Sequence, residues 1–246
     1  EVYLPEKKKI ILTRIIFAAA LLGITPMFGG IGTALGLWEP MTGFRMTMNY
    51  YNISIISSLI VLYLVIKHFI TDVTQSICTF LVLIIFLGAG YLLGINKEAP
   101  DITGLRGIHD VTTDMENPPE FIALLDAPGR RNSFDYPAET ADRQKAKFPW
   151  VKPLMTMLPV NEAYERALII AREMNWDIVG EDPQVGRFEA TDYTKWFNFH
   201  DDLVVKVSPT IEGSRIDLRS LSRVGGSDHG LGATRIMDFQ RKFKAK

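Results

Sequence analysis

The segment spanning residues 219–236, "RSLSRVGGSDHGLGATRI", gathers side chains that can bind an anion or carry acid–base chemistry. Arginine holds carboxylate and phosphate groups through paired N–H donors, and the unpaired N–H groups that begin a helix favour negative charge. A stretch with helical spacing follows the glycines. The segment therefore predicts an anion site, with these candidate ligand-binding residues: Arg219, Ser220, Ser222, Arg223, Ser227, Asp228 and Arg235.

The same segment also fits a structural role. It has no lysine of the kind that a phosphate-binding loop uses, and the carboxylate of Asp228 would repel an anion. In this interpretation Ser227 or Asp228 caps the last helix, and the glycines form a tight turn. The arginines then pair with carboxylates elsewhere in the chain, for which we expect Asp217, Glu189 or Asp202.

Histidine and aspartate residues at two other places are candidate metal ligands. No HExxH or CxxC motif is present, and Cys78 is the only cysteine. Neighbouring residues on a strand point to opposite sides, so a metal site requires the fold to bring distant residues together. Solvated turns and helix caps are the alternative, and we predict neither a resident metal nor another cofactor. The residues concerned are His109, Asp110, His200, Asp201 and Asp202.

Serine-based hydrolysis is a further alternative. A serine nucleophile needs a base within hydrogen-bond reach, which for Ser220 or Ser222 means His200 or His229. The sequence lacks the GxSxG motif, and hydrogen bonding to the backbone is the ordinary role of such serines. The lack of a recognisable catalytic set favours a protein that is not an enzyme.

Periodic elements must position these side chains. Residues 161–174 repeat apolar side chains at helical spacing, with Asn161 as the expected N-cap. Residues 201–207 and 214–223 alternate apolar and polar side chains, as strands with one buried face do. A second helix is expected at about residues 231–243. This order predicts an α+β fold in which helices pack on an antiparallel sheet.

The chain from about residue 97 to residue 159 is rich in proline and poor in periodicity. We expect it to be an extended segment that wraps around the domain. Aromatic residues are scarce in disordered segments, and here they would attach the segment to the core. They are Phe121, Phe134, Tyr136, Phe148 and Trp150.

The first 96 residues are more apolar than the rest of the chain. Crossing a bilayer takes about 20 apolar residues, and three stretches qualify, at about 15–37, 52–70 and 73–95. The sequence therefore predicts a membrane-anchored α+β protein. A transmembrane domain of three helices (1–96) would precede an extracytoplasmic domain (97–246).

The distribution of positive charge predicts an orientation. Arg14 and the run "KKK" precede the first stretch, Lys67 and His68 separate the second from the third, and the intervening loop holds only Arg45. Positively charged loops stay in the cytoplasm. We therefore expect a multi-pass protein of the bacterial inner membrane, with a cytoplasmic N-terminus and a periplasmic C-terminal domain.

Three runs with specific spacing, "HDVTTDMENPPEF", "DDLVVKV" and "SRIDLRSLSRVGGSDHGLGATRI", carry a family resemblance. Over about residues 105–244 the chain resembles the uncharacterised bacterial domain-of-unknown-function family fourteen ninety-nine. Gly232 departs from the family pattern, which has asparagine there. The resemblance implies a single bacterial domain in an extracytoplasmic, often membrane-attached setting, and it implies no activity. The matching positions include Asp110, Thr112, Thr113, Asp114, Asp201, Asp202, Arg219, Ser220, Ser222, Arg223, Asp228 and Arg235.

Together these observations favour a non-enzymatic accessory or assembly subunit of a larger bacterial membrane protein complex. Its expected partners are membrane lipids and other integral membrane proteins. The net charge of −1 argues against general nucleic-acid binding, which needs a clustered positive field. One alternative is a periplasmic module that binds an anionic ligand or a lipid headgroup, and a second is an uncharacterised hydrolase. The sequence names no small-molecule ligand.

Overall fold

A computed structural model of the chain describes residues 14, 18, 25, 27–69 and 107–245. The chain divides into two compact units. The first is Glu1–Lys97 with Trp196–Asn198, and the second is Glu98–Lys195 with Phe199–Lys246. In the first unit, helix α2 comprises Pro40–Phe69.

Helix α2 corrects the predicted membrane domain. It contains most of the predicted second span, but Arg45, Asn49 and Asn52 precede its apolar stretch and Lys67 follows it. The stretch between these polar residues is shorter than the roughly 20 residues that a bilayer requires. Among the described residues, no helix is both long enough and apolar enough to cross a membrane.

The predicted membrane-anchored fold with three transmembrane helices is therefore wrong for the part of the chain that the structure describes. The predicted multi-pass inner-membrane localisation is contradicted by the same finding, and the predicted periplasmic placement of the C-terminal domain, which depended on those helices, loses its basis. Part of the predicted first span, 15–37, and all of the third, 73–95, lie outside the described residues.

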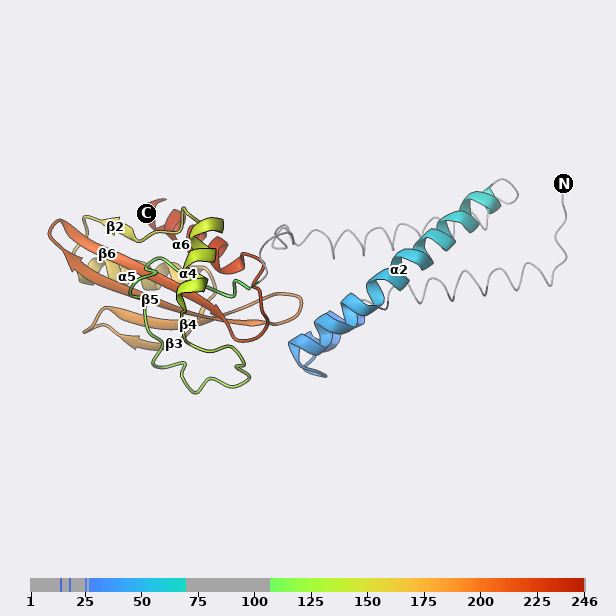
Figure 1. Cartoon of the computed structure of the whole chain (residues 1–246), viewed down its shortest axis with the longest axis horizontal. Coiled ribbons are helices and arrows are strands. Elements are labelled where there is room, and N and C mark those ends of the chain that lie inside the picture. Colours follow the sequence, from blue (N-terminus) through green and yellow to red (C-terminus); the bar gives the residue numbers. More distant parts are fainter. Residues whose placement is uncertain (1–13, 15–17, 19–24, 26, 70–106, 246) are drawn as a thin grey trace. The chain divides into compact units, whose positions relative to one another are not determined.

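The second unit is built on one antiparallel sheet, which confirms the predicted sheet packed by helices (Figure 1). The strand order is β1-β6-β5-β4-β3, and β2 also pairs with β6. The strands are β1 (Asp110–Thr112), β2 (Leu154–Thr156), β3 (Asp177–Asp182), β4 (Arg187–Tyr193), β5 (His200–Thr210) and β6 (Gly213–Ser222). The helices of this unit are α4 (Ala138–Lys147), α5 (Val160–Glu173) and α6 (Leu231–Ala245).

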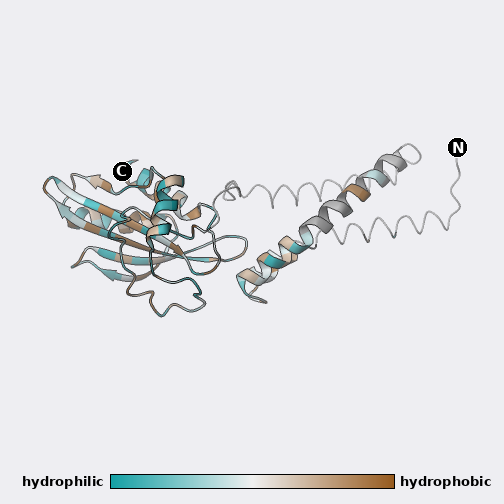
Figure 2. Cartoon of the chain, in the orientation of Figure 1, coloured by the Kyte–Doolittle hydropathy of each residue, from teal (hydrophilic) through white to brown (hydrophobic). Residues whose placement is uncertain are grey.

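The β5–β6 hairpin lies in the middle of the strand order, and most residues of both strands are buried. Apolar and polar residues occur along both strands, visible as both colours in Figure 2. The two strands pair from Asp201↔Ser222 to Thr210↔Gly213. Gly213 has a φ of +145°, and a Cβ there would lie 2.3 Å from the carbonyl oxygen of Thr156. Only glycine allows the hairpin to turn this close to β2.

Helices α5 and α6 cover one face of the sheet, which we call the helix face. Helix α5 begins at Val160 with Pro159 at its N-cap, so Asn161 lies in the first turn and the predicted cap at Asn161 is wrong. The apolar side of α5 faces the sheet and includes Ala167 and Ile170. Side chains from both helices and the sheet form the main core, including Ile170, Phe188, Leu203, Ile216, Leu218, Ile236 and Phe239.

The opposite face of the sheet, here called the loop face, is covered by residues 114–135, which form neither helix nor strand. Phe121 and Leu124 of this segment pack against Val204 of β5 and Leu221 of β6 in a second apolar cluster. Phe134 lies on Phe121, with ring centroids 5.2 Å apart. The segment therefore has its own anchors on the sheet.

Candidate functional site

Strand alternation divides the predicted site residues between the two faces of the sheet. Ser220 and Ser222 share the helix face with Ile216 and Leu218, whereas Arg219 points to the loop face with Leu221. Successive strand residues point to opposite sides, so Ser220 and Ser222 cannot form one binding surface with Arg219.

Arg219 forms a buried pair with Asp110 of β1. Its Nη2 donates to Oδ2 at 2.6 Å and its Nε to Oδ1 at 3.0 Å. The remaining donors reach the backbone carbonyls of Phe134 and Pro119. The two side chains are 4% and 3% exposed. Burial raises the pKa of Asp110, and the hydrogen bond and charge of Arg219 oppose that rise.

Arg223 forms the second buried pair, with Asp202 of β5. Nε and Nη2 bind the two carboxylate oxygens at 2.9 and 2.8 Å. Thr191 of β4 accepts from Arg223 and donates to Asp202. Nη1 of Arg223 lies 3.1 Å from the carbonyl oxygen of Pro128 and 3.2 Å from Nδ1 of His200. Burial, and next the charge of Arg223, lower the pKa of His200, so its neutral ring accepts this hydrogen bond.

A third arginine organises the helix face. Arg235 of α6 pairs with Asp192 of β4 and donates to Asp201 of β5 at 2.7 Å. Ser222 donates to Asp201, and Nη1 of Arg235 lies 3.4 Å from Oγ of Ser220. Burial lowers the pKa of Arg235, but the charges of Asp201 and Asp192 outweigh burial and the net direction is upward. These contacts tie the last helix to the sheet.

Asp228 caps α6, as the structural interpretation predicts. Its Oδ1 accepts the N–H of Gly230 at 2.7 Å and its Oδ2 accepts the N–H of Gly232 at 2.8 Å. A Cβ at position 232 would lie 2.7 Å from that carboxylate, which explains a glycine here. Burial raises the pKa of Asp228 to about 6. Ser227 accepts the N–H of His229, whose φ is +54°.

The metal candidates are not brought together. Among the described residues, no group of three or more His, Cys, Asp or Glu residues could hold a metal ion. Asp110 and Asp202 are bonded to separate arginines on the loop face, and Asp201 is bonded to Arg235 on the other face. His109 Nδ1 is buried and has no hydrogen-bond partner within the described part of the chain.

Ser222 and His200, one of the pairs considered for serine hydrolysis, lie on opposite faces of the sheet. Ser222 donates to Asp201 on the helix face, whereas His200 contacts Arg223 and the ring of Tyr193 at 4.7 Å. Ser222 and His200 therefore form no nucleophile–base pair.

Sequence reasoning found one of the arginine partners and missed the others. The pairing of Arg223 with Asp202 was among the expected ones. Asp110 and Asp192 were not expected as partners of Arg219 and Arg235, because they lie 109 and 43 residues away in the sequence. The strand pattern of β4 does indicate that Thr191 shares a face with Glu189, but it does not say which strands are neighbours.

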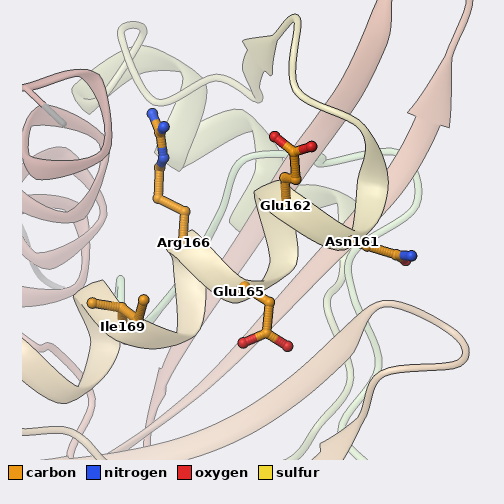
Figure 3. Close-up of a pocket in the computed structure, with 5 residues that line it drawn as sticks. All are labelled: Asn161, Glu162, Glu165, Arg166 and Ile169. Atoms are coloured by element: carbon orange, nitrogen blue, oxygen red, sulfur yellow. The ribbon is translucent and has the colours of Figure 1, made fainter.

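One hollow of about 580 Å³ lies along α5, away from all these groups. It is lined by Asn161, Glu162, Glu165, Arg166 and Ile169. Figure 3 shows Glu165 on the opposite side of the helix from Arg166 and Glu162. A row of side chains from one helix, pointing in different directions, offers no convergent set of polar groups for a ligand.

Comparison with known proteins gives a family. A search of the curated proteins found no match to the chain. The profile of the family described as "Protein of unknown function (DUF1499)" matches residues 110–243, from the first strand to the last helix. The match includes Asp110, Asp202, Arg219, Arg223 and Arg235, the residues that form the buried pairs. The chain therefore belongs to this family of unknown function, DUF1499.

Proposed function

We propose that the chain is a non-enzymatic accessory or assembly subunit of a larger protein complex and that it binds its partner through one end of the sheet. The observation that carries this proposal is a group of exposed apolar side chains at that end, which we call the tip surface. The tip surface consists of Met155, Met157, Val185 and Ile211.

Three connections place these side chains at the same end of the sheet (Figure 1). Ile211 is in the β5–β6 turn, and the pairing of Thr156 with Ser214 puts the chain around Met157 beside that turn. Val185 is in the β3–β4 turn, where the N–H of Val207 donates to the carbonyl oxygen of Gly186 at 2.8 Å.

The exposure of these residues is high for apolar side chains. Met157 is 86% exposed, and Ile211 is fully exposed at 104%. Apolar side chains that gather on a surface typically mark a site of protein association, and methionine is common at such interfaces because it adapts its shape. Burying them against a partner would remove this apolar area from water.

The polar interior supports a role without catalysis. Asp110, Asp202 and Asp201 each accept hydrogen bonds from an arginine, and the serines of β6 bond to neighbouring side chains. Groups held in this way stabilise a fold and are not available as nucleophiles or bases. For the same reason the anion-binding alternative at Arg219 and Arg223, which stays a prediction, has less support.

The proposal is tested by comparing the unaltered chain with a double variant, Met157→Ser and Ile211→Ser, purified from native host cells. We expect a partner protein to co-purify with the unaltered chain and to be lost from the variant. The melting temperature should be unchanged, because neither side chain is buried.

A matched control replaces two exposed apolar residues on the loop-face segment, Ile122→Ser and Leu125→Ser, which are 57% and 52% exposed. This control should keep the partner. A chain that purifies as a monomer without a partner, or a tip variant that retains the partner as well as the control does, would contradict the proposal.

A further inference from the structure

Asp202 accepts hydrogen bonds from two arginines, Arg223 and Arg130, and only Arg223 has partners for all its side-chain nitrogens. Besides Arg223, Nη2 of Arg130 donates to Oδ2 of Asp202. The side chain of Arg130 is 10% exposed and that of Asp202 is fully buried. Nε and Nη1 of Arg130 are buried and find no hydrogen-bond acceptor within the described part of the chain. This guanidinium is therefore desolvated without being satisfied.

Hydrogen bonds hold the backbone next to Arg130 in place. The N–H groups of Arg131 and Asn132 donate to the carbonyl oxygen of Arg223 at 2.8 and 3.0 Å. The side-chain amide of Asn132 donates to the carbonyl oxygens of Ser222 and Gly225. The guanidinium itself lies 4.0 Å from the centre of the Phe134 ring.

The charges around Arg130 do not balance. Arg130, Arg219 and Arg223 lie close enough for their charges to affect one another, and they share two carboxylates, Asp202 and Asp110. Both carboxylates are already engaged by bidentate arginines. The cluster thus has one positive charge more than its carboxylates neutralise, and burial lowers the pKa of Arg130 accordingly.

The shape of the guanidinium defines what would complete the site. Nη2 has two hydrogens, and Asp202 takes one of them. The free edge combines the second Nη2 hydrogen with the N–H of Nε or of Nη1, neither of which has a partner among the described residues. These two N–H bonds are parallel, the arrangement that binds two oxygens of a carboxylate or a phosphate. A water molecule could accept one hydrogen bond here but would leave the excess charge in place.

We propose that Arg130 and its surroundings form a binding site for a small oxoanion, a phosphate or a carboxylate, on the loop face of the sheet. This site goes beyond the proposed assembly function and is independent of the tip surface. Gly129 precedes Arg130 in the chain, and a Cβ added there would meet no atom within 4 Å. The anion neutralises the excess charge and accepts the free N–H donors of Arg130.

The first test measures the melting temperature of the full chain in inorganic phosphate and, separately, in acetate, each against chloride at matched ionic strength. We expect saturable stabilisation by at least one anion, and the two series distinguish phosphate from carboxylate. Arg130→Gln should weaken the apparent affinity roughly tenfold or more, whereas Arg131→Gln, an exposed neighbour, should stay within about twofold. Equal responses in chloride and in both anions would refute the site.

The second test uses the unaltered chain, so it does not depend on whether a variant folds. Crystals soaked in selenate are examined by anomalous scattering. A selenium peak within hydrogen-bond distance of Arg130 is the expected result. A water molecule alone at Nε and Nη1, with no anomalous signal, would overturn the proposal.

Discussion

At the scale of single residues, the polar interior includes two ion pairs whose members are all buried, Arg219 with Asp110 and Arg223 with Asp202. Taking two charges out of water is costly, and their attraction repays that cost only when the remaining hydrogen-bonding groups are also satisfied. Arg219 meets this condition through Asp110 and two backbone carbonyls. Removing one member of such a pair leaves the other charge buried and alone.

Arg219→Ala is therefore expected to lower the free energy of unfolding by about 3 kcal/mol, because Asp110 would lose its partner. Urea unfolding measures this loss. The control is Arg241→Ala on α6, whose pair with Asp238 is largely exposed at the arginine and should contribute about 0.5 kcal/mol or less. An Arg219 variant as stable as the control would show that this pair does not hold the fold together.

The raised pKa of Asp228 makes the free energy of unfolding depend on pH, and its direction gives the sign of that dependence. Its pKa is raised to about 6 in the folded chain, above the unfolded value of about 4. The folded state therefore holds the proton more tightly, and this stabilisation is present at low pH and is lost as pH rises through 6. Between about pH 4 and pH 7 the loss is on the order of 2 kcal/mol.

The measurement compares the unaltered chain with Asp228→Asn by urea unfolding at several pH values in this range. Asparagine does not titrate, so the unaltered chain should lose stability relative to the variant as pH rises. A stability difference between the two chains that is constant with pH would contradict a raised pKa for Asp228.

At the scale of elements, residues 114–135, the loop-face segment, have no regular secondary structure. This segment therefore lacks the internal hydrogen bonds of a helix or strand, and a side chain of β4 accepts hydrogen bonds from its backbone. Both carboxylate oxygens of Glu189 accept backbone N–H groups, from Ile122 at 2.8 Å and from Leu124 at 3.0 Å. Glu189 is 1% exposed and also pairs with Arg187. Backbone groups buried outside helices and strands need such partners.

Glu189→Gln should loosen this segment, because glutamine keeps one acceptor oxygen and presents an NH2 group to the other backbone N–H. We expect a loss of about 2 kcal/mol in the free energy of unfolding. Hydrogen exchange at Ile122 and Leu124 should accelerate more than at Val205 in the central strand. Glu181→Gln, in an exposed pair with Arg172, is the control. Equal acceleration at all three amides would mean that Glu189 acts on the whole fold and not on the segment.

At the scale of the second unit, one sheet separates two different interiors. The helix face is mainly apolar, and the loop face combines a small apolar cluster with the buried pairs of Arg219 and Arg223. The exposed tip surface and the Arg130 site belong to different parts of this unit. Partner binding and anion binding can therefore be tested by separate variants.

The sequence by itself determined the local features of this domain. Alternation predicted β5 and β6 and placed Ser220 and Ser222 together, and helical spacing predicted α5 and α6 nearly to their ends. Alternation did not predict β1 and β2, which lie in the segment expected to be extended. The glycine turn with an aspartate cap could also be read from residue types, because capping is a contact between near neighbours. Hydropathy predicted a membrane span over most of α2, but no helix among the described residues is both long and apolar enough to cross a membrane.

Only the tertiary structure decided which side chains meet. Asp110 reaches Arg219 because β1 pairs with β6 across more than a hundred residues, and no local pattern encodes that pairing. Arg130 reaches Asp202 from a segment without periodicity. The role of residues 219–236 therefore depended on strand pairing. That pairing brings Arg219 and Arg223 to buried carboxylates. The side chain with unsatisfied hydrogen-bond donors is instead Arg130.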